Sequence, residues 1–252
     1  MPLVPGAEPY HHDGGPVGVL LLHGLSGSPA AVRPWGQALA EAGYTVDAPR
    51  LPGHGTTWQE LNMCRWPDWW AVADRAFVRL RERCERVVVG GLSFGGALAL
   101  RVAEQHGAEV AGVMVVNPFL KTDDPRRHFV LPIRHLLKSY PGIINDIKKE
   151  GQDEIGYARL SLLATHSSLQ FLDIVREDLP QVTQPLLHAH SLVDHTIGTI
   201  GTEVLRSRVS STHIVDLPLP DSYHVATLDH DAPEIFRASV DFVAEVTAGV
   251  PT

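Results

Sequence analysis

The sequence predicts an α/β protein with a mostly parallel, doubly wound sheet and helices on both faces. Short apolar runs rich in β-branched residues alternate with helical patterns along most of the chain. The segment 17–23, VGVLLLH, is apolar up to its final histidine, as expected of a central parallel strand buried on both faces. The 252 residues are enough for one domain with a large core.

The predicted elements follow one another in a regular order. Helical periodicity in 30–43 ends at a glycine, and 67–84 begins with Pro-Asp and continues as an amphipathic helix. The predicted strands are 17–23, 44–49, 86–92, 110–117, 185–191 and 212–219, and the predicted helices are 30–43, 67–84, 94–107, 199–208 and 231–247. Right-handed crossovers between these strands give the doubly wound sheet.

The alternation stops between residues 119 and 180. This stretch contains helical patches but no convincing strand, and it is too long for a plain connection. Its segments 129–137 and 160–175 have too much apolar spacing for disorder. We therefore expect a core formed by 1–118 and 181–252, with 119–180 inserted as a helical cap above the carboxyl edge of the sheet.

A serine lies between a predicted strand and a predicted helix. The sequence Gly91-Leu92-Ser93-Phe94-Gly95 follows strand 86–92 and opens helix 94–107. A sharp turn at such a junction projects the serine Oγ above the sheet, and flanking glycines let strand and helix approach closely. We predict that Ser93 is a nucleophile.

The tripeptide Gly-Leu-Ser also occurs at 24–26, in the loop HGLSGSP. No helical pattern opens directly after Ser26, so this serine is not expected to react. The glycines of the loop instead suit an oxyanion hole. We predict that the backbone N–H groups of Leu25 and Phe94 bind the substrate oxygen.

A nucleophilic serine needs a base and an acid that orients the base. Chain order on this type of sheet places the acid and then the histidine after later strands. Of the 14 histidines, His224 follows the last predicted strand and precedes the final helix, whereas His230 lies nearer the helix start. We predict His224 as the base.

Asp194 follows strand 185–191, where the acid is expected, and we predict it in that role. Asp123, after the fourth strand, is the alternative. Asp216 lies within a predicted strand and Asp221 is close to His224 in sequence, so both are poorer candidates.

Other histidines suggest structural roles or a metal pair. We expect His23 to support the oxyanion loop and His54 to make a turn contact. His188 and His190 alternate on one strand face, but no third ligand joins them at a convincing spacing, so we expect no metal. No G-x-G-x-x-G or Walker motif occurs, so no nucleotide cofactor is expected either.

Charge and segment composition limit the partners. The net charge is −8 and no basic block stands out, which argues against nucleic-acid binding. The N-terminus lacks the pattern of a signal peptide, and no apolar run reaches membrane-spanning length. With two unpatterned cysteines, the sequence favours a cytoplasmic protein. It makes no prediction of oligomeric state.

The segments GPVGVLLLHGLSGSP, AGYTVDAPRLPGHGT, GGLSFGGALAL and DSYHVATLDHD resemble the bacterial monoacylglycerol lipase and thermostable carboxylesterase group of the α/β-hydrolase superfamily. The resemblance implies a cofactor-free, cytosolic enzyme of lipid metabolism whose substrates are small carboxylic esters or monoacylglycerols. Its triad falls on Ser93, Asp194 and His224, and its oxyanion donors fall on Leu25 and Phe94. Two alternatives stay open: thioesterase or acyltransferase chemistry on the same triad, and a non-catalytic ligand-binding protein of this fold.

Overall fold

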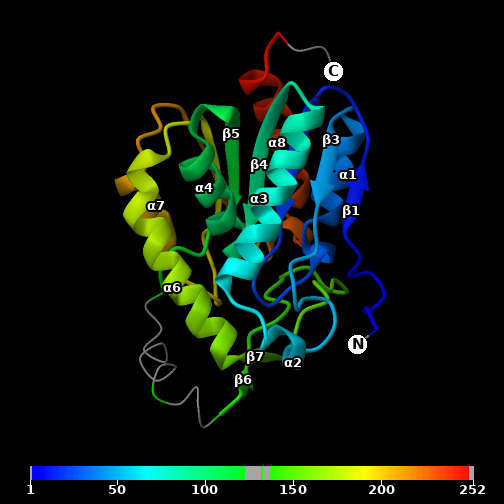
Figure 1. Ribbon diagram of the computed structural model, residues 1–252, viewed down its shortest axis with the longest axis vertical. Coiled ribbons are helices and arrows are strands. Elements are labelled where there is room, and N and C mark those ends of the chain that lie inside the picture. Colours follow the sequence, from blue (N-terminus) through cyan, green and yellow to red (C-terminus); the bar gives the residue numbers. More distant parts are fainter. Residues whose placement is uncertain (1, 123–131, 133–136, 250–252) are drawn as a thin grey trace.

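The computed structural model describes residues 2–122, 132 and 137–249. Its main sheet has seven strands in the order β1-β3-β2-β4-β5-β8-β9, with β1 antiparallel to β3 and the other pairs parallel (Figure 1). The helices and strands are β1 Tyr10–His12, β2 Val17–Leu22, α1 Arg33–Glu41, β3 Thr45–Ala48, α2 Trp58–Leu61, α3 Trp66–Arg83, β4 Arg86–Leu92, α4 Phe94–His106, β5 Val110–Val116, β6 Ser139–Pro141, β7 Arg159–Ser161, α6 Leu162–Asp178, β8 Leu186–Ser191, α7 Ile200–Arg208, β9 Ile214–Leu219 and α8 Ala232–Val246.

Helices cover both faces of the sheet, and strand β4 shows why. Its side chains alternate, so Val87 and Val89 join one buried cluster while Val88 joins the other. The first cluster contains Phe77 of α3 together with side chains of α4 and α6, and the second contains Trp35 of α1 with side chains of α8. The predicted fold class, a mostly parallel doubly wound sheet, is confirmed.

The structure differs from the sequence prediction where the strands are short. The expectation of no strand between 119 and 180 is wrong, because β6 and β7 pair there as a small antiparallel sheet. Each of these strands has three residues, as has β1, which is too short for a period-two pattern to show in the sequence.

The predicted cap region has two described parts that pack differently. The β6–β7 pair contacts α2 and α6, whereas α6 itself packs against α3 and α4. Residues 123–131 and 133–136, which include most of the apolar segment 129–137, lie outside the described residues. The boundaries 119–180 of a cap therefore stay a prediction.

Tyr157 attaches this region to loops at the carboxyl edge of the main sheet. Its backbone N–H donates to Ser26 O at 3.0 Å, and its hydroxyl donates to Gly53 O at 2.7 Å. These two bonds join the loops after β2 and β3 to the segment that leads into β7. In the part of the chain that the structure describes, every helix is too short or too polar to cross a lipid bilayer.

Candidate active site

The turn between β4 and α4 holds Ser93 in an unusual backbone conformation, with φ 56° and ψ −120°. A non-glycine residue there is strained, and the surrounding structure must hold it in place. The Ser93 N–H donates to Val116 O at 3.0 Å and supplies part of that restraint. A Cβ on Gly91 would lie 2.1 Å from Gly95 O, and one on Gly95 would lie 1.9 Å from Leu22 O. Only glycine fits at these two positions.

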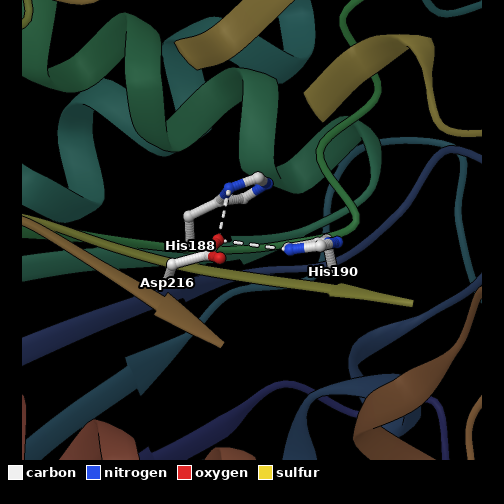
Figure 2. A group of neighbouring side chains, drawn as sticks. All are labelled: His188, His190 and Asp216. Atoms are coloured by element: carbon white, nitrogen blue, oxygen red, sulfur yellow. Dashed lines mark ion pairs between the residues drawn. The ribbon is translucent and has the colours of Figure 1, made fainter. Parts of the chain in front are cut away.

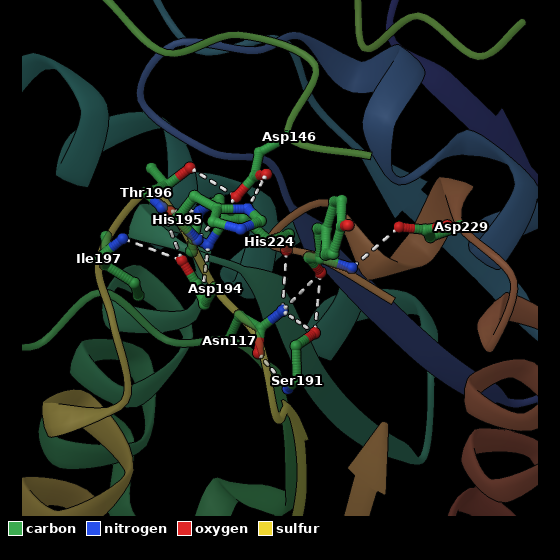
Figure 3. Close-up of polar contacts among 11 residues, drawn as sticks. Asn117, Asp146, Ser191, Asp194, His195, Thr196, Ile197, His224 and Asp229 are labelled. Atoms are coloured by element: carbon green, nitrogen blue, oxygen red, sulfur yellow. Dashed lines mark hydrogen bonds and ion pairs between the residues drawn. The ribbon is translucent and has the colours of Figure 1, made fainter. Parts of the chain in front are cut away.

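The three side chains predicted for a triad are hydrogen-bonded in series. His224 Nε2 lies 2.9 Å from Ser93 Oγ, and His224 Nδ1 lies 2.7 Å from Asp194 Oδ2. Asp194 comes from the loop after β8 and His224 from the loop after β9, as Figure 3 shows. The side chains of Asp194 and His224 are 2% and 7% exposed, so solvent weakens their interaction little.

Burial and charge have opposite effects on the pKa values of His224 and Asp194. Burial acts to lower the pKa of His224, but the charge of Asp194 and its hydrogen bond outweigh burial, and the pKa of His224 is raised. Burial likewise disfavours the carboxylate of Asp194. The charge of His224, its hydrogen bond and the N–H groups of Ile197 and Thr196 nevertheless hold the pKa of Asp194 below its ordinary value. The arrangement therefore favours an ionised acid next to a basic imidazole.

The two predicted oxyanion donors lie beside Ser93. Phe94 follows it as the first residue of α4, where helix N–H groups have no partner within the helix. The loop of Leu25 passes close by, since a Cβ on Gly24 would lie 3.4 Å from Ser93 Cβ. Among the described residues, neither the Leu25 N–H nor the Phe94 N–H donates to a protein acceptor. Both remain available to a substrate oxygen.

Two buried histidines support this loop. His23 Nδ1 lies 2.9 Å from Gly24 O, and the Leu51 N–H donates to His23 Nε2 at 3.1 Å. The proton is therefore assigned to Nδ1. Burial, with a smaller contribution from the nearby His54, places the pKa of His23 well below its ordinary value, which keeps the ring neutral. His54 Nε2 lies 2.8 Å from Leu25 O, and burial lowers the pKa of His54 to about 4.

The other candidates for the acid and the base were Asp123, Asp216, Asp221 and His230. Asp221 forms an ion pair with Lys148 at the surface, and His230 is exposed. Asp216 pairs with residues of β8 and α7 rather than with His224. Asp123 lies outside the described residues.

The sequence analysis did not identify Asn117, which follows β5. Its Nδ2 donates to His224 O at 2.8 Å and to Ser191 Oγ at 2.9 Å, and its Oδ1 accepts from the Ser191 N–H at 2.7 Å (Figure 3). It thereby joins the ends of β5 and β8 to the His224 loop. The signal in the sequence that could have identified Asn117 is a polar residue directly after an apolar strand.

Asp146 was also missed. Its carboxylate lies 2.9 Å from His195 Nδ1 and accepts from the His195 N–H at 3.0 Å and from Thr196 Oγ1 at 3.2 Å (Figure 3). These contacts fix the loop that carries Asp194. No local motif marks Asp146, which lies 49 residues before His195 in the sequence.

A cavity of about 180 Å³ opens beside Ser93 Oγ and His224. Most of its wall is apolar. The wall is formed by loops that follow strands of the main sheet, by residues in and next to the β6–β7 pair, and by α6. The apolar side chains include Leu25, Phe119, Ile143, Leu160, Leu162, Leu169 and Ile197. Such a wall suits a hydrocarbon chain whose polar end faces Ser93.

The chain is similar to known hydrolases over nearly its whole length. The model of the alpha/beta hydrolase family matches residues 19–250. The chain is 34% identical to the thermostable monoacylglycerol lipase of Bacillus sp. strain H-257, with 97% of each chain covered. It is 26% identical to a carboxylesterase of Bacillus subtilis strain 168, covering 95% of this chain and 97% of that one. A solved structure from work on the metagenome-derived lipolytic enzymes LipS and LipT superposes with a TM-score of 0.94 and 36% identity, covering 97% of this chain and all of the other.

Proposed function

The chain belongs to the alpha/beta hydrolase family and is a hydrolase of carboxylic esters, and from this premise we propose that it cleaves them by acyl transfer through Ser93, His224 and Asp194. The observation that carries the proposal is the continuous hydrogen-bonded series from Ser93 Oγ through the imidazole to Asp194, which opens onto an apolar cavity. Water completes the reaction by attacking the acyl-enzyme.

In the first step, His224 Nε2 takes the proton of Ser93 as Oγ attacks the ester carbonyl carbon. The carbonyl oxygen becomes an oxyanion, which the N–H groups of Leu25 and Phe94 bind. Preorganised donors of this kind lower the barrier by about 3–4 kcal/mol each. The Asp194 carboxylate orients the imidazole and stabilises its charged form.

When the tetrahedral intermediate collapses, the ester C–O bond breaks and His224 protonates the leaving alcohol. The acyl group remains on Ser93 Oγ. His224 then takes a proton from water as the water oxygen attacks the acyl carbon. When the second intermediate collapses, His224 returns this proton to Ser93 Oγ, and the carboxylic acid leaves.

The substrates we propose are monoacylglycerols and simple esters of short to medium acyl chains. The apolar wall beside Ser93 supports an acyl pocket, and the two Bacillus relatives carry the names monoacylglycerol lipase and carboxylesterase.

A panel of nitrophenyl esters from C2 to C16, with monoacylglycerols of matched chain length, tests this. We expect both classes to be hydrolysed and both activities to disappear in Ser93→Ala. Hydrolysis of short simple esters with no turnover of monoacylglycerols would contradict the proposed monoacylglycerol lipase activity and support only the esterase activity. Faster turnover of a thioester with the preferred acyl chain would favour the thioesterase alternative.

A further inference from the structure

Two histidines of β8 and one aspartate of β9 form a cluster on one face of the sheet. His188 and His190 are two residues apart, so both point to the same side of their strand. Asp216 is paired directly with His188 in the β8–β9 register. The dashed lines in Figure 2 run from both imidazoles to the same carboxylate oxygen of Asp216. The third possible metal ligand, which the sequence alone did not reveal, is therefore Asp216 on the neighbouring strand.

The distances within this cluster are short. Asp216 Oδ1 lies 3.2 Å from His190 Nε2 and 3.7 Å from His188 Nδ1. One ligand atom from each residue lies within 4.8 Å of those of the other two. In a tetrahedral zinc site with bonds of about 2.0–2.1 Å, neighbouring ligand atoms are roughly 3.3 Å apart. Small side-chain adjustments would bring these three atoms to that spacing.

The hydrogen bonding of the two rings is incomplete. His188 is fully buried, yet neither of its ring nitrogens has a hydrogen-bond partner among the described residues. His190 Nε2 is likewise buried and lacks a hydrogen bond of good geometry there. Buried imidazole nitrogens nearly always have a hydrogen-bond partner. Two imidazoles that lack one and lie beside the same carboxylate therefore indicate a binding site.

We propose that His188, His190 and Asp216 bind a divalent transition metal ion, Zn²⁺ being the best fit. Two imidazole nitrogens and one carboxylate oxygen are a ligand set that zinc accepts, and water would complete the tetrahedron. The site is separate from the Ser93 cavity, whose wall contains none of the three residues.

Arg206 of α7 competes with the metal for the same carboxylate. Its guanidinium forms an ion pair with Asp216 Oδ1, and its side chain is 45% exposed. A long, half-exposed side chain can turn into solvent when a divalent cation arrives. The Asp216 side chain is 39% exposed, which gives the ion a route from solvent.

The position of the site indicates what the metal does. The β8 strand leads into the loop of Asp194, and β9 leads into the loop of His224. An ion shared by β8 and β9 therefore ties together the two strands that carry the acid and the base. Because strand pairing assembles the three ligands, the metal binds the folded chain and stabilises it.

The test uses the full chain after chelator treatment, with Zn²⁺ alone as the ligand in calorimetry and thermal unfolding. We expect one tight site per chain. At about a hundred times the dissociation constant, Tm should rise by roughly 5–10 °C. His190→Asn and Asp216→Asn should each weaken binding at least tenfold and remove most of the rise in Tm. Co²⁺ alone should give tetrahedral absorption bands that disappear in His190→Asn.

Two further variants separate this site from nonspecific binding and from misfolding. His213→Asn breaks an exposed pair in which His213 Nε2 lies 3.2 Å from Glu245 Oε1, and zinc binding should not change. Arg206→Gln removes the competing cation, so zinc should bind several-fold more tightly, a gain that misfolding cannot produce. Equal zinc affinity in wild type, His190→Asn and Asp216→Asn would overturn the proposal, as would unchanged or weaker binding by Arg206→Gln.

Discussion

The ring of His23 holds the peptide group between Gly24 and Leu25, because its Nδ1–H donates to Gly24 O over 2.9 Å. The N–H on the other side of that peptide group is the Leu25 donor that we assign to the oxyanion hole. Leu51 in turn holds the opposite ring nitrogen. The orientation of one backbone N–H thus depends on a side chain that does not touch the substrate.

Replacing His23 should therefore reduce turnover more than binding. We expect His23→Ala to lower kcat about 10–100-fold with little change in KM, because a misaligned donor acts mainly on the transition state. His23→Asn should recover part of the loss, since its amide can donate near the former Nδ1. Steady-state kinetics on a nitrophenyl ester measures both constants. A change in KM alone would show that His23 does not position the donor.

The two Gly-Leu-Ser serines should behave differently. Ser93→Ala should lower kcat by at least about 10⁴-fold, since the acyl-enzyme cannot form. Ser26→Ala should stay within a few-fold of wild type, because only the Leu25 N–H of that loop is needed. Turnover, together with labelling by a fluorophosphonate, distinguishes the two. Labelling of the Ser93→Ala protein at another serine would contradict the assignment.

The pH profile should reflect the raised pKa of His224. The imidazole must be neutral to accept the Ser93 proton, so kcat/KM should fall as the pH drops through a value above that of an ordinary histidine. Asp194→Asn removes the charge that raises this pKa. The acid limb should then move to lower pH, while kcat falls about 10³–10⁴-fold. An unmoved limb in Asp194→Asn would mean that another group sets the profile.

Asp146 should matter for the Asp194 loop. Asp146→Asn loses charged hydrogen bonds to His195 and Thr196, which should lower the free energy of unfolding by about 1–3 kcal/mol and reduce kcat. Denaturant unfolding and kinetics measure the two effects. The control is Lys148→Gln, which breaks only the exposed ion pair with Asp221 and should change stability by less than about 1 kcal/mol. Equal effects of the two variants would argue against a positioning role.

A methyl group at Gly95 should disrupt the turn that carries Ser93. The added Cβ would lie 1.9 Å from the backbone oxygen of Leu22, so β2 and α4 would have to separate. We expect Gly95→Ala to lose several kcal/mol or to fail to fold. At Gly107 an added Cβ meets open space, but the backbone, with φ 51° and ψ −124°, is strained for alanine, which should cost about 1–3 kcal/mol. Thermal unfolding compares the two, and a Gly95→Ala protein as stable as Gly107→Ala would contradict the close packing.

The fold was predictable because its signals are local. Apolar runs such as 86–92 and helical patterns such as 67–84 are long enough for their periodicity to identify them, and the structure has β4 and α3 within one residue of those bounds. Strands β1, β6 and β7 are three residues long and carry no such periodicity. Only their pairing in the folded chain identifies them, β1 with β3 and β6 with β7.

The sequence by itself determined the mostly parallel α/β sheet, the strand-to-helix position of Ser93, and Asp194 and His224 as the residues to test beside it. Each follows from chain order and short-range pattern. Only the tertiary structure decided that Asp146 holds the Asp194 loop, that Leu51 fixes the ring of His23, and that Asp216 joins His188 and His190. Their partners are far apart in the sequence or on neighbouring strands, and a contact of that kind leaves no periodic trace along the chain.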